Sequence, residues 1–163
     1  MISPAIRVKQ VAIETHGCKL NQADSMDLAA RFAASGFEVV DGSQEVDVYV
    51  LNTCTVTHVA DRKARQALRS ARRRSPDATI VVTGCYAERS PETLRGLDDV
   101  DVVAGNQAKS TLVAHLARSF DSMNVPCATG SDSEPVILKL GRSRGMVKIQ
   151  EGCDQVCSYC IVP

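Results

Sequence analysis

Residues 46–54 read Val-Asp-Val-Tyr-Val-Leu-Asn-Thr-Cys, and this stretch decides the fold class. Its first six residues, 46–51, are mostly apolar and rich in valine, which is typical of a strand buried on both faces. Strands of that kind belong to parallel sheets covered by helices on both sides. The polar pair Asn52-Thr53 ends the apolar run, so Cys54 is predicted to lie in the loop that leaves the strand.

Similar strand-like stretches alternate with helix-like stretches along the chain. Strands are predicted at residues 8–14, 37–40, 46–51, 79–83 and 100–104. Helices are predicted from a cap at Asn21 or Asp24 to about residue 35, over 56–74, from Pro91 onward for a short distance, and over 109–120. This alternation predicts an α/β fold, with an open, parallel, flavodoxin-like sheet of about five strands flanked by helices.

The composition excludes several other classes of protein. The chain has 163 residues, in which 19 Lys and Arg balance 19 Asp and Glu, so it is not a uniformly basic nucleic-acid binder. Hydrophobic residues make up 44%, as in ordinary globular chains. No apolar run approaches the length of a membrane span, and residues 1–10 lack the apolar centre of a signal peptide. We therefore expect no membrane association and a cytoplasmic location.

The pattern divides the chain into two domains of unequal extent. Residues 1–120 carry the alternating pattern and form the first domain. Residues 121–140 are predicted to be a linker, because the stretch 121–135 is rich in Ser, Asp, Gly and Pro. Residues 141–163 are predicted to start a second domain, with a strand at 146–150 (MVKIQ), and to contain only its beginning.

Three of the seven cysteines each follow a predicted strand. Cys18, Cys54 and Cys85 lie in three strand-to-helix loops. Such loops meet at the carboxyl edge of a parallel sheet, where ligands bind, so the three thiols are expected to converge. Soft sulfur ligands select zinc, copper(I) or iron–sulfur clusters. The alternative is that these cysteines are small buried hydrophobic residues.

Three further cysteines lie close together near the end of the sequence. Cys153, Cys157 and Cys160 have the spacing C-x3-C-x2-C, with Tyr159 just before the third. Three thiols in one loop can hold a 4Fe–4S cluster and leave its fourth iron free. The loop resembles the signature of radical S-adenosylmethionine enzymes and is expected to follow the first strand of a (β/α) barrel. A zinc site is the alternative, although zinc usually takes two pairs of ligands.

The four cysteine motifs together resemble one family of radical enzymes, the methylthiotransferases. They are HGCKLNQADS (16–25), LNTCTV (51–56), TGCYA (83–87) and the loop 151–163. The first two look most like the branch that acts on N6-threonylcarbamoyladenosine in tRNA. Met26 departs from the pattern, because the family often has Glu at that point.

The resemblance implies two 4Fe–4S clusters and S-adenosylmethionine as cofactors. Cys18, Cys54 and Cys85 would bind an auxiliary cluster, and Cys153, Cys157 and Cys160 the radical cluster, with Tyr159 beside the cofactor. A deoxyadenosyl radical then takes hydrogen from C2 of the adenine next to the anticodon, and a methylthio group is transferred from the auxiliary cluster. The implied partners are the anticodon loop of tRNA and an electron donor such as a flavodoxin-type reductant. The rest of the barrel and an RNA-binding module lie outside this sequence, so this chain alone is not expected to be active.

Several alternatives stay open at the level of sequence. The substrate could be an isopentenyladenosine tRNA or a ribosomal protein, or the chain could be a non-enzymatic metal-binding α/β module.

One face of the predicted helix 56–74 is basic and could contact RNA or simply face solvent. His16 and His58 could donate a hydrogen bond to a cluster sulfur or be ordinary loop residues. Cys127 has no partner at ligand spacing and is predicted not to be a ligand. The basic face comprises Arg62, Arg65, Arg69, Arg72 and Arg73.

Overall fold

Strands and helices alternate from the start of the described chain to residue 121. The structure, a computed structural model, describes residues 8–54, 58–121, 148–150, 153–155 and 157–158. The strands are β1 (Gln10–His16), β2 (Glu38–Val40), β3 (Val48–Thr53), β4 (Thr79–Thr83) and β5 (Val102–Ala104). The helices are α1 (Lys19–Ala34), α2 (His58–Arg74), α3 (Cys85–Arg89), α4 (Pro91–Arg95) and α5 (Lys109–Asp121).

The five strands form one parallel sheet in the order β2-β1-β3-β4-β5. In the centre, Val50 of β3 pairs with Ile13 of β1 and with Val81 of β4. This is the strand order of flavodoxin-like folds, in which every strand ends at the same edge. The predicted α/β fold is confirmed for the described chain up to residue 121. Among the described residues, no helix has the length and apolar character needed to cross a membrane.

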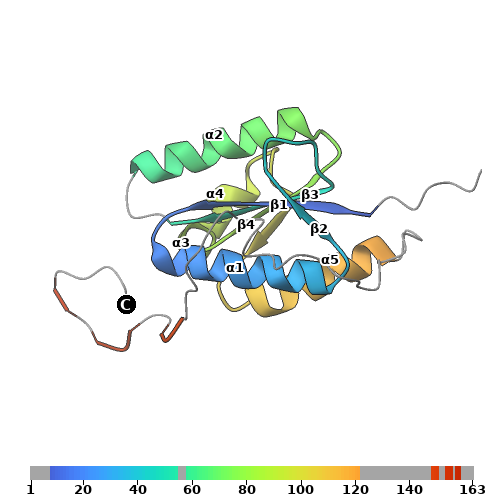
Figure 1. Cartoon of the computed structure of the whole chain (residues 1–163). Helices are drawn as coiled ribbons and strands as arrows, with labels where there is room; N and C mark the ends of the chain where they lie inside the picture. Colours follow the sequence, from blue (N-terminus) through green and yellow to red (C-terminus); the bar gives the residue numbers. More distant parts are fainter. Residues whose placement is uncertain (1–7, 55–57, 122–147, 151–152, 156, 159–163) are drawn as a thin grey trace, which may run out of the picture.

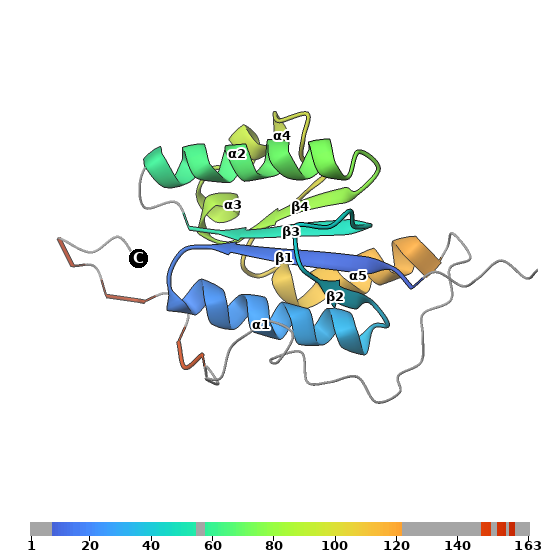
Figure 2. The same cartoon turned by 45° about the horizontal axis from the view of Figure 1, so that its top comes forward.

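Helices cover both faces of the sheet, as Figures 1 and 2 show. Helices α1 and α5 pack on one face over Val48 and Val50, and α2, α3 and α4 pack on the other over Tyr49 and Leu51. All six residues of β3 are buried. Alternate side chains of the valine-rich stretch therefore enter two separate cores, which explains why the sequence there is apolar without a polar face.

Two local predictions were wrong. Helix α1 begins at Lys19 directly after Cys18, and neither Asn21 nor Asp24 caps it, because both side chains are buried in contacts within the fold. A strand was predicted at 146–150, but the described part of it, residues 148–150, is not a strand. The side chain of Lys148 in this stretch pairs with Asp24 of α1.

Candidate functional site

The topology brings the three strand-end cysteines to one edge of the sheet. Cys18 lies between β1 and α1, Cys54 follows β3 directly, and Cys85 is the first residue of α3 after β4. All three strands are parallel neighbours in the sheet, so all three cysteines lie at the carboxyl edge. None of the three forms a disulfide, and Cys18 and Cys85 are exposed residues.

Cys18 and Cys54 share a pocket. They line a cavity of about 660 Å³ together with His16, Gly17, Val59, Ala60 and Lys63. Cys85 is not among the described residues that line this cavity. In residues 8–54, 58–121 and the short described stretches after 147, no three His, Cys, Asp or Glu side chains are grouped closely enough to hold a metal ion. The structure therefore brings two thiols together and leaves the third apart at the same edge.

Two glycines allow the three cysteine loops to approach one another. Gly17 has φ +151°, and a Cβ there would lie 2.8 Å from the Cβ of Cys54. Gly84 has φ +92°, and a Cβ there would lie 2.4 Å from the carbonyl oxygen of Thr53. Only glycine adopts such backbone angles without strain. The first and third loops are therefore both packed against the second.

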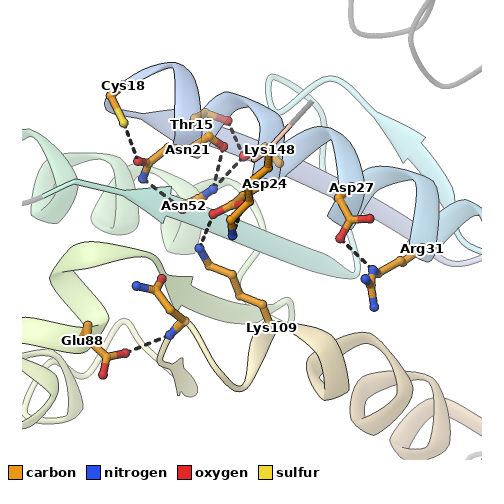
Figure 3. Close-up of polar contacts among 12 residues, drawn as sticks. Thr15, Cys18, Asn21, Asp24, Asp27, Arg31, Asn52, Glu88, Lys109 and Lys148 are labelled. Atoms are coloured by element: carbon orange, nitrogen blue, oxygen red, sulfur yellow. Dashed lines mark hydrogen bonds and ion pairs between the residues drawn. The ribbon is translucent and has the colours of Figure 1, made fainter. Parts of the chain in front are cut away.

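A buried amide pair supports the cysteine loops from below (Figure 3). The thiol of Cys18 donates to Asn21 Oδ1 at 3.2 Å, and Asn21 Nδ2 donates to Asn52 Oδ1 at 3.2 Å. Asn52, which is fully buried, donates in turn to the backbone oxygen of Asn21 at 2.8 Å and to Ser25 Oγ at 3.0 Å. Asn21 and Asn52 therefore join two cysteine loops.

A second polar group lies beside the same edge. His16 Nε2 pairs with Glu14 Oε1 at 2.7 Å, and the Tyr49 hydroxyl donates to the other oxygen of Glu14. Burial, together with the bond to Glu14, raises the pKa of Tyr49 well above its ordinary value, so this phenol stays protonated.

Two buried polar atoms at this edge have no hydrogen-bond partner among the described residues: His16 Nδ1, next to Gly17-Cys18, and Thr83 Oγ1, next to Gly84-Cys85. A buried polar atom without a partner lowers the stability of the fold by about 1–3 kcal/mol. A group bound at this edge could recover that loss by forming hydrogen bonds with His16 Nδ1 and Thr83 Oγ1. The soft thiols, the close glycine backbone and these unpaired atoms fit a sulfur-ligated metal group. Cys18 and Cys54 would hold it, with Cys85 as the further ligand at the same edge.

The second cysteine triad is described only in part. Cys153 is half-buried, and its sulfur accepts a hydrogen bond from the Gln155 N–H at 3.5 Å, while Cys157 is exposed. Cys160 and Tyr159 lie outside the described residues, as does Cys127. In both Figures 1 and 2 the described stretches after residue 147, drawn in red, lie at the end of the molecule where α1 begins.

The basic face of α2 is divided between two roles. Arg62, Arg69 and Arg73 are exposed. Arg72 is not free to bind RNA as predicted, because its guanidinium donates to Ala78 O at 2.8 Å and to Asp101 Oδ2 at 2.7 Å, which ties α2 to the beginning of β4 and β5. Lys63 lines the pocket but was not predicted to do so. Its position about one turn into the helix that follows Cys54 could have indicated this.

Comparisons with known proteins agree with the cysteine motifs. The chain is 40% identical over 161 residues to "Threonylcarbamoyladenosine tRNA methylthiotransferase MtaB" of Aquifex aeolicus, which covers 94% of this chain and 39% of that protein. It is 36% identical over 171 residues to the protein of the same name in Bacillus subtilis, covering 94% of this chain and 36% of that protein. It is 36% identical over 167 residues to "tRNA-2-methylthio-N(6)-dimethylallyladenosine synthase" of Porphyromonas gingivalis strain W83, covering 95% and 36%.

The chain thus spans less than two-fifths of the length of these relatives. Their names confirm the resemblance to methylthiotransferases that the motifs indicated. The model of "Uncharacterized protein family UPF0004" matches residues 10–105, the whole region from β1 to the end of β5. Since this match covers more than half of the chain, the protein belongs to the UPF0004 family.

Proposed function

We propose that the chain serves in a tRNA methylthiotransferase that adds a methylthio group to C2 of N6-threonylcarbamoyladenosine next to the anticodon. The observation that carries the proposal is the agreement between the four cysteine motifs and several relatives named for this activity, at 34–40% identity. Relatives named for dimethylallyladenosine, at 33–36% identity, support the alternative substrate less well. Residues 1–120 form the first domain, 121–140 the linker, and 141–163 the start of the radical domain.

Each cysteine triad has its own role in this proposal. Cys18, Cys54 and Cys85 hold one 4Fe–4S cluster, and Cys153, Cys157 and Cys160 hold the other, with Tyr159 beside S-adenosylmethionine. When bound, these groups supply the radical and the sulfur. The chain itself fixes the ligands: Asn21 and Asn52 hold the first loop against the second, and Gly84 lets the third approach. A flavodoxin-type reductant is the proposed electron donor.

The exposed cations of α2 form the proposed contact with tRNA. Lys63 lines the pocket of Cys18 and Cys54, and Arg62, Arg69 and Arg73 are exposed on the same helix. Each lost phosphate contact should lower the slope of log affinity against log salt by about 0.7–0.9. Changing Arg62, Arg69 and Arg73 to Ala in the full-length protein, with Arg72 kept because it ties the fold together, should reduce this slope. An unchanged slope would show that this face only meets solvent.

The experiment that tests the function separates the two triads. In the full-length protein, Cys157→Ala should abolish both deoxyadenosine formation and the methylthio nucleoside, because only that triad can present S-adenosylmethionine. Cys85→Ala should abolish the methylthio nucleoside and keep some cleavage of S-adenosylmethionine. Both products are measured by mass spectrometry. Normal methylthio product from Cys85→Ala, with the second cluster intact, would refute the proposed role of the first triad.

The non-enzymatic alternative is tested by colour and metal content. Anaerobically reconstituted protein should be brown and absorb as iron–sulfur proteins do, whereas a colourless protein with one bound zinc would favour a structural module. Mass spectrometry of tRNA nucleosides from a strain without the gene identifies the substrate, since the missing nucleoside is the methylthio derivative of either the threonylcarbamoyl or the isopentenyl form.

A further inference from the structure

A buried carboxylate on α1 binds two lysines from distant parts of the chain. Asp24 Oδ2 accepts from Lys109 Nζ at 2.6 Å, and Asp24 Oδ1 accepts from Lys148 Nζ at 2.9 Å, as Figure 3 shows. The Asp24 side chain is only 9% exposed. Each carboxylate oxygen therefore has its own ammonium partner, and the group is fully engaged.

The two lysines differ in origin and in exposure. Lys109 is the first residue of α5, so its bond lies within the first domain, and its side chain is 12% exposed. Lys148 is 124 positions from Asp24 in the sequence, five before Cys153, and its side chain is 29% exposed. Lys148 belongs to no strand or helix, and the neighbouring Ile149 is 93% exposed. The contact at Lys148 thus joins the first domain to the chain that enters the second cysteine triad.

The arrangement allows one of the two contacts to open at little cost. Burial by itself raises the pKa of Asp24, but the hydrogen bonds and charges of Lys109 and Lys148 outweigh this effect and leave the pKa below its ordinary value. A buried charge with no partner is strongly destabilising. Because Lys109 occupies the other carboxylate oxygen, release of Lys148 would not by itself leave Asp24 unpaired. Lys109 is the more deeply buried partner, and Lys148 is the more exposed one.

We propose that Asp24 is a positioning residue that docks the chain leading into the second cysteine triad onto the first domain. The contact is its ion pair with Lys148, which can open and close. The inference rests on the proposed function, in which both triads must act on one nucleotide. The docked stretch lies at the end of the molecule where α1 begins, which is also the end that carries Cys18. This ion pair therefore keeps the described stretches with Cys153 and Cys157 at the same end of the sheet as Cys18.

The contact itself is tested in the 163-residue chain, without metal or tRNA. A carbodiimide, which joins a carboxylate to an amine in direct contact, should give cross-linked peptides of Asp24 with Lys148 and with Lys109. Lys148→Arg should lose only the first product. Hydrogen exchange at residues 148–150 and 153–155 should be faster in Lys148→Met by a factor of about two to five, the size expected for a partly exposed ion pair. Lys148→Arg should keep the slower exchange of the wild type.

The melting temperature of the first domain separates docking from folding. Lys148→Met should leave it unchanged, whereas Lys109→Met should lower it. In the full-length enzyme, Lys148→Met should keep cleavage of S-adenosylmethionine and lower the yield of methylthio nucleoside severalfold. Absence of the Asp24–Lys148 cross-link, with wild-type exchange rates in Lys148→Met, would refute docking through this ion pair even if the protein is a methylthiotransferase. Conversely, the cross-link and exchange results stand even if the proposed function fails.

Discussion

Asn21 and Asn52, 31 residues apart in the sequence, exchange two hydrogen bonds across the base of the cysteine site. The amide of Asn21 donates to the side chain of Asn52, and the amide of Asn52 donates to the backbone oxygen of Asn21. Because Asn21 also accepts the thiol of Cys18, the first cysteine is linked to the strand that ends at Cys54. Buried polar bonds therefore hold the loops of Cys18 and Cys54 together.

Loss of the Asn52 amide should therefore destabilise the fold. Asn52→Ala leaves buried partners unpaired, so the free energy of unfolding should fall by about 1–3 kcal/mol in urea denaturation. Asn106→Ala is the matched control, because the bond recorded there is made by its backbone N–H to Glu88 and not by its side chain. Equal stability of the two variants would contradict the role given to the amide pair.

A methyl group at Gly84 should be poorly tolerated. Gly84→Ala places a Cβ 2.4 Å from Thr53 O and 2.5 Å from Asn52 Oδ1, at a φ of +92°. The unfavourable backbone alone costs about 1–3 kcal/mol, and the contact with backbone oxygen adds to this. Gly42→Ala, where the nearest atom is 3.8 Å away, should be nearly neutral in the same denaturation experiment. A stable Gly84→Ala would mean that the third loop is not packed as described.

Arg72 and Arg73 are neighbours on α2 with opposite expected roles. Arg72→Ala removes bonds to Ala78 O and Asp101 and should lower the free energy of unfolding by about 1–3 kcal/mol. Arg73→Ala, on the exposed surface, should change it by no more than about 0.5 kcal/mol. If the two variants were equally stable, the Arg72 contacts would contribute nothing to folding.

The ion pairs of Asp24 should appear in the pH dependence of stability. Its pKa lies below the ordinary value of 3.8 in the folded state, so folding favours the ionised form. The resulting stability is present above the unfolded pKa and is lost as the pH falls through the folded pKa. Asp24→Asn should therefore show a shallower fall in stability below about pH 4. Equal slopes in wild type and Asp24→Asn would refute the assignment.

Much of the first domain could be predicted from the sequence. The apolar stretch 46–51 fixed the central strand, and the spacing of strands and helices led to a parallel sheet with Cys18, Cys54 and Cys85 at one edge. These features depend on local pattern and on the handedness of parallel connections, both of which are general.

The rest depends on contacts between residues far apart in the sequence. Nothing local distinguishes Arg72, which binds Asp101, from the exposed Arg73. Asp24 looks like a helix cap in the sequence, and its bond to Lys148 spans 124 positions. The short helix α3, which begins at Cys85, was not predicted, and Cys85 does not line the pocket of Cys18 and Cys54.

Iron content tests the central claim, that the strand-end cysteines hold a cluster. The anaerobically reconstituted full-length protein should bind about eight irons, four for each triad. Cys54→Ala should bind about four and keep the second cluster, while Cys127→Ala, which removes a cysteine predicted not to be a ligand, should bind about eight. If Cys54→Ala bound as much iron as Cys127→Ala, the carboxyl-edge cysteines would not be the ligands of a second cluster.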